Sequence, residues 1–97
     1  MASHLTYPEQ AAPCCWVYIL KAESDRLSIR YCLDLPSEAL SIPCDTHLLF
    51  YRSFPAVHEA IAYKLYLENI SLETLDLLIV AGNPRRRDLR KILMQNK

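Results

Sequence analysis

The residues that could do chemistry lie in or near one apolar stretch, "WVYILKAESDRLSIRYCLDL", which spans residues 16–35. Arg30 places a full charge where a buried strand would carry a small or apolar side chain. Ser28 together with His47 or His58 would supply a nucleophile and a base. Nothing resembles the G-x-S-x-G motif, however, and no acidic partner stands at an informative spacing. Tyr18 in a strand is typical of a core or half-buried position. Arg30 is therefore the residue that a purely structural account leaves unexplained.

The four cysteines form no recognisable metal motif. A zinc site built from Cys32, Cys44 and His47 is the one alternative, but the chain contains no C-x-x-C pair. Cys14 and Cys15 are adjacent, so in an extended strand their side chains point to opposite faces and do not readily hold one ion. We therefore expect buried, reduced structural thiols and no metal site.

The composition is that of one globular domain with little net charge. Hydrophobic residues make up 52% of the 97 residues, and the formal net charge is zero. A zero balance argues against broad electrostatic capture of nucleic acid or membrane. No apolar stretch approaches the ~20 residues of a membrane span, and residues 1–13 lack the pattern of a secretory signal. We expect a cytoplasmic protein with a flexible lead-in at 1–13, a single domain at 14–97 and no membrane partner.

One local excess of positive charge stands near the C-terminus. It consists of Arg85, Arg86, Arg87, Arg90 and Lys91. A charge run of this kind is usually a solvated helix face, and the alternative is a surface that binds nucleic acid. Binding through such a patch would weaken steeply with salt. Binding of a protein partner through apolar contacts would be much less sensitive to salt.

Hydrophobic periodicity and turn residues predict the order β-β-α-β-α-α-α. The expected strands are 14–21, 27–33 and 47–53, and the expected helices are 36–42, 56–69, 72–81 and a last basic helix that begins at Asn83-Pro84. Ser71 is the expected N-cap of the third helix, and Gly82, the only glycine, is expected to end it. The fold class is α/β (α+β), a small three-stranded antiparallel sheet flanked by helices.

One helix carries charge on its apolar side. On a helical wheel of 100° per residue, Lys64 and Glu68 fall inside the arc defined by Val57, Ile61 and Leu65. The structural interpretation is that Lys64 lies at the helix edge and pairs with Glu68, four residues further on. The alternative is a functional role for Lys64.

A series of short motifs runs along the chain in a characteristic order. The motifs are Val17-Tyr18-Ile19-Leu20, Asp34-Leu35, Leu48-Leu49-Phe50-Tyr51, Phe54, Glu59-Ala60, Ser71, Leu78-Ile79, Asn83-Pro84 and Arg87-Asp88-Leu89. In this order and spacing they resemble the small single-domain members of the GIY-YIG nuclease family. The resemblance covers about residues 15–92, and the Asn-Pro-x-x-Arg-Asp-Leu tail is its most specific part. It implies a GIY-YIG-like fold with the predicted three-stranded sheet.

The resemblance also implies hydrolysis of a phosphodiester with one divalent metal. In the family, a first-strand tyrosine helps activate water, a helix arginine stabilises the phosphate charge, and a glutamate on a later helix holds the metal. Tyr18 retains the first of these residues. The tyrosine of the second motif falls on Ser28, and the glycine of that motif falls on Arg30. The helix arginine falls on Glu38, and the metal-binding glutamate falls on Lys64.

These replacements reverse the charges of the inferred site. At ~4 Å and an effective dielectric constant of ~20, turning an attractive contact with a metal into a repulsive one at Lys64 is worth several kcal/mol. Glu38 in place of an arginine repels phosphate. The segment between Leu35 and Leu48 is also shorter than in the family and contains no Lys or Arg. We hypothesise that Glu38 pairs with Lys64 or with Arg30 and fills the former cleft.

The sequence thus predicts a degenerate GIY-YIG endonuclease-like domain that has lost metal-dependent hydrolysis. We expect no enzymatic activity, no cofactor, and a role as a binding module for nucleic acid or protein. The alternative is a divergent GIY-YIG endonuclease that still cleaves DNA with Mg²⁺. It would use Tyr18 and shifted ligands such as Glu59 or Glu68.

Overall fold

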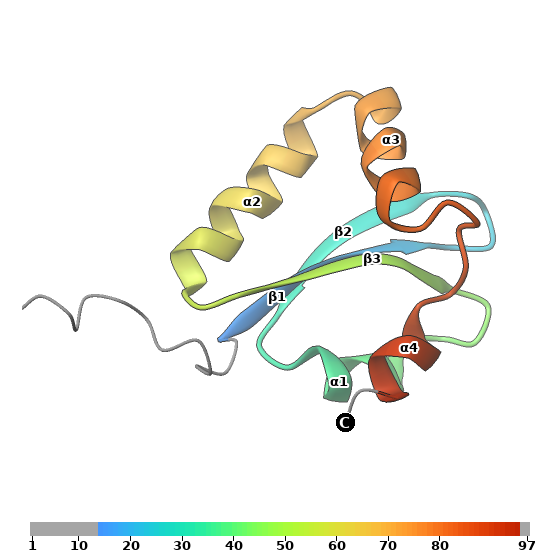
Figure 1. The fold of residues 1–97 in the computed structure, drawn as a ribbon, viewed down its shortest axis with the longest axis horizontal. Coiled ribbons are helices and arrows are strands. Elements are labelled where there is room, and N and C mark those ends of the chain that lie inside the picture. Colours follow the sequence, from blue (N-terminus) through green and yellow to red (C-terminus); the bar gives the residue numbers. More distant parts are fainter. Residues whose placement is uncertain (1–13, 96–97) are drawn as a thin grey trace, which may run out of the picture.

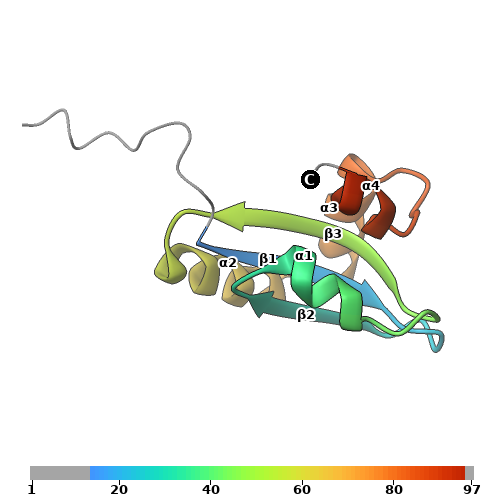
Figure 2. The same cartoon turned by 90° about the horizontal axis from the view of Figure 1, so that it is seen from below.

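The chain forms one antiparallel sheet with helices on both faces (Figures 1 and 2). The computed structural model describes residues 14–95, so the expected lead-in at 1–13 lies outside the described residues. The strand order in the sheet is β2-β1-β3, which places the first strand in the centre. The predicted fold class and the predicted order of strands and helices are confirmed.

The strands and the two long helices begin and end within one residue of their predicted bounds. The elements are β1 (Cys15–Lys21), β2 (Leu27–Cys32), α1 (Leu35–Glu38), the 3₁₀ turn η2 (Ala39–Ser41), β3 (His47–Phe54), α2 (Val57–Asn69), α3 (Leu72–Gly82) and α4 (Arg90–Gln95). Ser71 caps α3 as predicted, because its side chain accepts a hydrogen bond from the backbone N–H of Thr74. Within residues 14–95, the helices are all too short or too polar to cross a bilayer.

The helix expected at 36–42 is shorter than predicted. It is the single turn α1 followed by η2, and Ile42 is extended with ψ 128°. Ile42 precedes Pro43, and a clash with the proline ring disfavours helical geometry for the residue before a proline. The chain therefore leaves the helix before Ile42, and residues 43–46 form a turn in which the Thr46 N–H donates to the Pro43 carbonyl (3.1 Å).

The last helix begins later than predicted. Asn83 does not cap it, since α4 starts only at Arg90. The Asn83 side chain is instead buried, where it donates to the carbonyl oxygens of Leu49 (3.2 Å) and Arg87 (2.8 Å) and accepts from the Arg87 N–H (3.0 Å). These bonds close residues 83–87 into a turn, so the prediction of a helix from Asn83 was wrong.

The sheet separates two apolar clusters. Successive side chains of a strand point to opposite faces, so neighbouring residues of β1 belong to different clusters. The cluster under α2 and α3 contains Cys15, Val17, Ile19, Leu49, Phe54, Ala60, Leu67, Leu75 and Ile79. The cluster under α1, η2 and α4 contains Tyr18, Leu20, Leu35, Ala39, Leu48 and Leu93. We call these two sides of the sheet the α2/α3 face and the α1/α4 face.

A β-bulge in β3 lies next to the place where the C-terminal tail bonds to the edge of the sheet. Ile19 pairs with Phe50 while Leu20 pairs with Leu48, so Leu49 is the extra residue. Beyond the bulge, the Leu48 N–H donates to the Asp88 carboxylate, and the Leu48 carbonyl accepts from the Leu89 N–H (2.8 Å). The tail thus covers backbone groups that an edge strand would otherwise expose.

Candidate functional site

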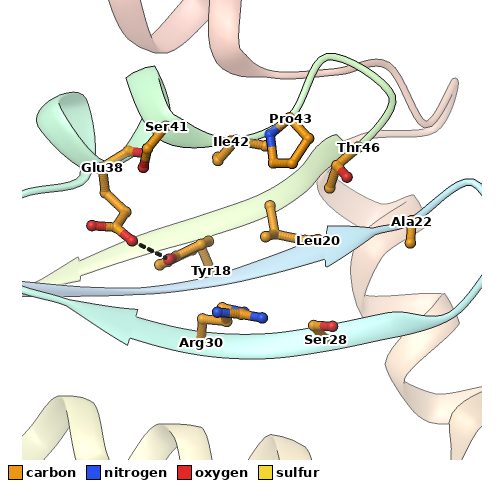
Figure 3. A pocket seen from close by; sticks show the side chains of 10 residues that line it. All are labelled: Tyr18, Leu20, Ala22, Ser28, Arg30, Glu38, Ser41, Ile42, Pro43 and Thr46. Carbon is orange, nitrogen blue, oxygen red and sulfur yellow. Dashed lines mark hydrogen bonds between the residues drawn. The ribbon is translucent and has the colours of Figure 1, made fainter.

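A pocket opens on the α1/α4 face, between β1, β2 and the turn that follows η2 (Figure 3). Its volume is about 230 Å³. Its lining residues are Tyr18, Leu20, Ala22, Ser28, Arg30, Glu38, Ser41, Ile42, Pro43 and Thr46. The pocket therefore brings together four of the five site residues predicted from the sequence, all except Lys64.

The strand register explains why three of these residues share one face. Tyr18 stands directly opposite Arg30, and Leu20 stands opposite Ser28, in the antiparallel pair of β1 and β2. Residues directly opposite each other project to the same side of a sheet. The fourth residue, Glu38, is the last residue of α1, and it also lines the pocket.

The Tyr18 phenol is directed at the Glu38 carboxylate. The hydroxyl donates to Glu38 Oε2 at 3.4 Å (Figure 3), and the Tyr18 side chain is almost completely buried. Burial, followed by the negative charge of Glu38, raises the pKa of Tyr18 to about 12, although the charge of Arg30 acts in the opposite direction. The phenol is therefore protonated at neutral pH.

Arg30 lies on the other side of the Tyr18 ring from Glu38 (Figure 3). Its side chain is exposed, and the structure shows no hydrogen bond or ion pair between Arg30 and another residue of 14–95. The hypothesised ion pair between Glu38 and Arg30 is not formed among the described residues, and the Glu38 carboxylate accepts a hydrogen bond from Tyr18. The pocket thus presents a positive and a negative group on either side of one neutral phenol.

Lys64 belongs to the opposite side of the molecule. It lies on α2, which packs on the α2/α3 face, and its ammonium pairs with Glu68 Oε2 at 2.6 Å. The structural interpretation of Lys64 as a helix-edge residue paired with Glu68 is confirmed. The hypothesised pair of Lys64 with Glu38 is wrong, because the sheet lies between α1 and α2 (Figure 2). Glu59, the other suggested shifted ligand, is also on α2 and not on the face of Tyr18.

The outer wall of the pocket is held by two residues that sequence reasoning did not assign to it. Arg90 donates from Nη1 to the Ile42 carbonyl (2.9 Å) and from Nη2 to the Thr46 carbonyl (2.9 Å). Its Nε and Nη2 also donate to the Asp88 carboxylate, at 3.0 Å and 2.5 Å to Oδ2. The D-x-R spacing that begins at the aspartate of the tail motif is the sequence signal that could have identified this arrangement.

The charge state of Asp88 follows from its neighbours. Partial burial disfavours the carboxylate, but hydrogen bonds from the Arg90 side chain and from the backbone N–H groups of Arg90 and Leu48 outweigh that effect. The pKa of Asp88 is therefore lower than its ordinary value.

The basic residues near the C-terminus do not form one uniform patch. Arg90 is directed inward at the pocket wall, and Arg86 forms an ion pair with Asp76. Arg85, Arg87 and Lys91 are exposed, and the structure shows no ion pair between them and the described part of the chain. Three of the five predicted nucleic-acid-binding residues therefore form no ion pair with another residue of 14–95.

The zinc site suggested by the sequence is not assembled. Cys32 stands opposite Trp16 at one end of β1, and His47 stands opposite Lys21 at the other end. Five residues along a strand span about 17 Å, so Cys32 and His47 cannot bind one ion. Within residues 14–95, no three His, Cys, Asp or Glu side chains come together in a group that could hold a metal.

All four cysteines are free thiols, but only two of them are buried or half-buried as expected. Cys15 is fully buried and Cys32 is half-buried, whereas Cys14 and Cys44 are exposed. The prediction of buried thiols is therefore wrong for Cys14 and Cys44. Burial is the main reason why the pKa of Cys32 is raised to about 11.

No protein-family model matches this chain, and no curated protein and no solved structure matches it. The functional interpretation therefore depends on the chain's own residues. Three features carry that interpretation: the pocket around Tyr18, the ion pairs of the basic tail, and the separation of Lys64 from the pocket.

Proposed function

We propose that this chain is a GIY-YIG-like domain that no longer hydrolyses phosphodiesters and serves as a binding module. One observation carries the proposal. Glu38 stands where the resemblance places a phosphate-binding arginine, and its carboxylate accepts the hydrogen bond of Tyr18, the phenol expected to help activate water.

This contact removes two functions that the family chemistry needs. A phenol with a pKa of about 12 keeps its proton at neutral pH, and that proton is directed at Glu38 and not at a water molecule. A phosphate that entered the pocket would also meet the negative charge of Glu38. Water screens this repulsion because Glu38 is exposed, but its sign is opposite to that of an arginine.

The pocket residues do not fit a divalent metal. Mg²⁺ in proteins takes oxygen ligands that include at least one carboxylate, and the pocket contains only Glu38, which accepts from Tyr18 and has Arg30 nearby. The shifted ligands of the alternative hypothesis lie on α2, on the other face of the sheet, and Glu68 there is neutralised by Lys64. The geometry therefore supports the binding module more than the divergent nuclease.

The partner that we propose is a protein. Two of the five basic residues in the tail are neutralised in ion pairs, so only three cations of the tail could meet nucleic acid, on a chain of zero net charge. Large apolar side chains are exposed instead, with Leu40 at 78% and Leu33 at 63% on the α1 side of the chain. The four free thiols support a reducing, cytoplasmic location.

A cleavage and binding assay tests this proposal. The full chain is incubated with Mg²⁺ or Mn²⁺ and with branched, nicked and linear DNA and RNA, and we expect no product. Fluorescence anisotropy on the same nucleic acids should show weak binding that disappears between about 50 and 200 mM salt. An Arg85→Ala, Arg87→Ala, Lys91→Ala variant should lose even this residual binding.

The matched controls decide between the two hypotheses. Cleavage that is lost in Tyr18→Phe and in Glu68→Gln or Glu59→Gln, but kept in the distant variant Glu73→Gln, would overturn the proposal and support the divergent nuclease. Salt-resistant binding of nucleic acid that survives the triple substitution would contradict the choice of a protein partner.

A further inference from the structure

The pocket on the α1/α4 face is lined by one positive and one negative side chain that do not pair with each other. Arg30 forms no ion pair within residues 14–95. Glu38 forms none within them either, and its Oε2 accepts a hydrogen bond from the neutral phenol of Tyr18. Ligand pockets typically combine an apolar lining with a few polar groups that fix the orientation of the ligand. This pocket offers two such groups, of opposite sign.

These groups follow one another along the pocket. Tyr18 and Leu20 are alternate residues of β1, so they line the same side of the pocket about 7 Å apart. Glu38 lies beside Tyr18, and Ser28 stands opposite Leu20. The Arg30 side chain extends along β2 toward Ser28 and away from Glu38 (Figure 3). The negative group therefore lies at one end of the pocket, and the positive group lies further along it.

The middle of the pocket is apolar. Leu20 lines it from β1, and Ile42 and Pro43 line it from the opposite wall (Figure 3). The volume of about 230 Å³ is below the ~300–1,000 Å³ of pockets for drug-sized ligands. The pocket therefore suits a molecule of few atoms with an apolar middle.

We propose that this pocket binds a small zwitterion, in which a short aliphatic chain joins an ammonium group to a carboxylate. The ammonium group donates to Glu38 Oε1 and to the phenol oxygen of Tyr18, which keeps lone pairs free because its proton is given to Glu38. The carboxylate accepts from the Ser28 hydroxyl and from the Arg30 guanidinium, whose planar fork matches two carboxylate oxygens. The aliphatic chain packs on Leu20.

Ligands with a single charge fit the pocket less well. An anion such as phosphate or butyrate is attracted by Arg30 but repelled by Glu38, and a cation meets the opposite combination. A neutral apolar molecule leaves both charges without a partner, whereas a zwitterion places each charge beside one of opposite sign. The proposal goes beyond the binding of a protein and does not rest on the loss of hydrolysis, because it needs only the charges that line the pocket.

The exposure of the two charged residues limits the affinity. Water and salt screen both contacts, since the Arg30 and Glu38 side chains are exposed. We therefore expect weak binding that decreases as the salt concentration rises. For a ligand of about seven non-hydrogen atoms, a dissociation constant on the order of 1 mM lies within the ceiling on affinity per atom.

Titration of the full, isotope-labelled chain, followed by NMR of the backbone amides, tests the proposal. The probes are β-alanine, γ-aminobutyrate and δ-aminovalerate, which separate the two charges by increasing lengths, in a buffer of low salt. We expect saturable shifts at Tyr18, Ser28, Arg30 and Glu38 with at least one probe, at a dissociation constant on the order of 1 mM. Butyrate and butylammonium, which carry one charge each, should bind about tenfold more weakly or worse.

Two outcomes of this titration would overturn the proposal. The first is the absence of saturable shifts with all three zwitterions up to about 50 mM. The second is binding of butyrate, butylammonium or inorganic phosphate that is as tight as that of the best zwitterion.

Variants of the two charged residues test where the ligand binds. Arg30→Met and Glu38→Gln should each weaken binding of the best zwitterion about tenfold or more, because each removes one of its two charged contacts. Arg26→Met and Glu73→Gln are matched changes outside the pocket and should leave binding unchanged. All four positions are exposed, so each variant should fold, which circular dichroism checks.

Butyrate supplies a test with the opposite sign. Glu38→Gln should bind butyrate more tightly than the wild type does, since the repulsion by the carboxylate is removed. Equal binding of the zwitterion by the wild type and all four variants, or weaker binding of butyrate by Glu38→Gln, would overturn the proposal.

Discussion

Arg90 and Asp88 form a two-point ion pair in the C-terminal tail, and the same guanidinium holds the wall of the pocket. Nε and Nη2 of Arg90 donate to the carboxylate. The remaining N–H groups reach the carbonyls of Ile42 and Thr46, which lie 48 and 44 residues earlier in the chain. One side chain therefore joins the tail, the edge of the sheet and the pocket.

We expect Arg90→Ala to lower the free energy of unfolding by about 2–3 kcal/mol, because it leaves the Asp88 carboxylate and two backbone carbonyls without their donor. Arg90→Lys should recover only part of this, since an ammonium lacks the planar fork of a guanidinium. Urea denaturation measures the effect. Arg87→Ala, which removes an exposed arginine of the same tail, is the control and should change stability by about 0.5 kcal/mol or less. Equal losses in both variants would contradict the role assigned to Arg90.

The lowered pKa of Asp88 predicts how stability depends on pH. The folded pKa lies below the unfolded value of about 3.9, so the folded state favours the carboxylate. This stabilisation is complete above the unfolded pKa and is lost as the pH falls through the folded pKa. The difference in unfolding free energy between the wild type and Asp88→Asn should therefore be largest near neutral pH and should shrink below about pH 4. Urea titrations at several pH values measure it, and a difference that does not vary with pH would be inconsistent with this pair.

The charges around Tyr18 predict how its pKa should change when either charged neighbour is replaced. The ultraviolet absorbance of the wild type minus that of Tyr18→Phe should show one phenol with a pKa of about 12. Glu38→Gln should lower this pKa, because it removes a neighbouring negative charge, and Arg30→Met should raise it, because it removes a positive one. If both variants shifted it in the same direction, the phenol would not lie between these two charges.

The thiols should react with a disulfide reagent in two classes. Cys14 and Cys44 are exposed, whereas burial raises the pKa of both Cys15 and Cys32. Only the thiolate attacks a disulfide, and a pKa of about 11 leaves Cys32 with roughly a thousandth of its thiol ionised at pH 8. The native protein at pH 8 should therefore show two fast thiols, and all four should react quickly in denaturant. Fast modification of Cys32 in the native protein would contradict the described burial.

The local parts of the fold could be predicted from the sequence because local physics determines them. Runs of β-branched and aromatic residues predicted the strands, and Ser71 predicted the start of α3. The two errors at helix ends have different causes, one in an adjacent residue and one in a tertiary contact. Pro43 ends the helix before Ile42, and the burial of Asn83 against Leu49 prevents it from capping α4. The second cause involves a contact between distant segments that no local pattern contains.

The candidate site could be predicted only where strand alternation applies. Alternation along one strand implies that Ser28 and Arg30 share a face. The pairing of Tyr18 with Arg30 is seen only in the structure. The helical wheel showed that Lys64 is unusual in α2, but it does not say which face of the sheet α2 covers. The structure places Lys64 away from Glu38, with Glu68 as its partner. Predicting that separation would have required the packing of the helices, which residue spacing does not determine.

Titration with Mg²⁺ and then Mn²⁺, followed by NMR of the backbone amides, tests the central claim most directly. The account predicts no saturable change at Tyr18, Arg30 or Glu38, because the only pocket carboxylate accepts from Tyr18 and has a guanidinium nearby. Saturable shifts at Tyr18 and Glu38, or at Glu59 and Glu68, accompanied by cleavage of DNA, would show a working metal site. That result would contradict the proposal that this domain has lost its nuclease chemistry.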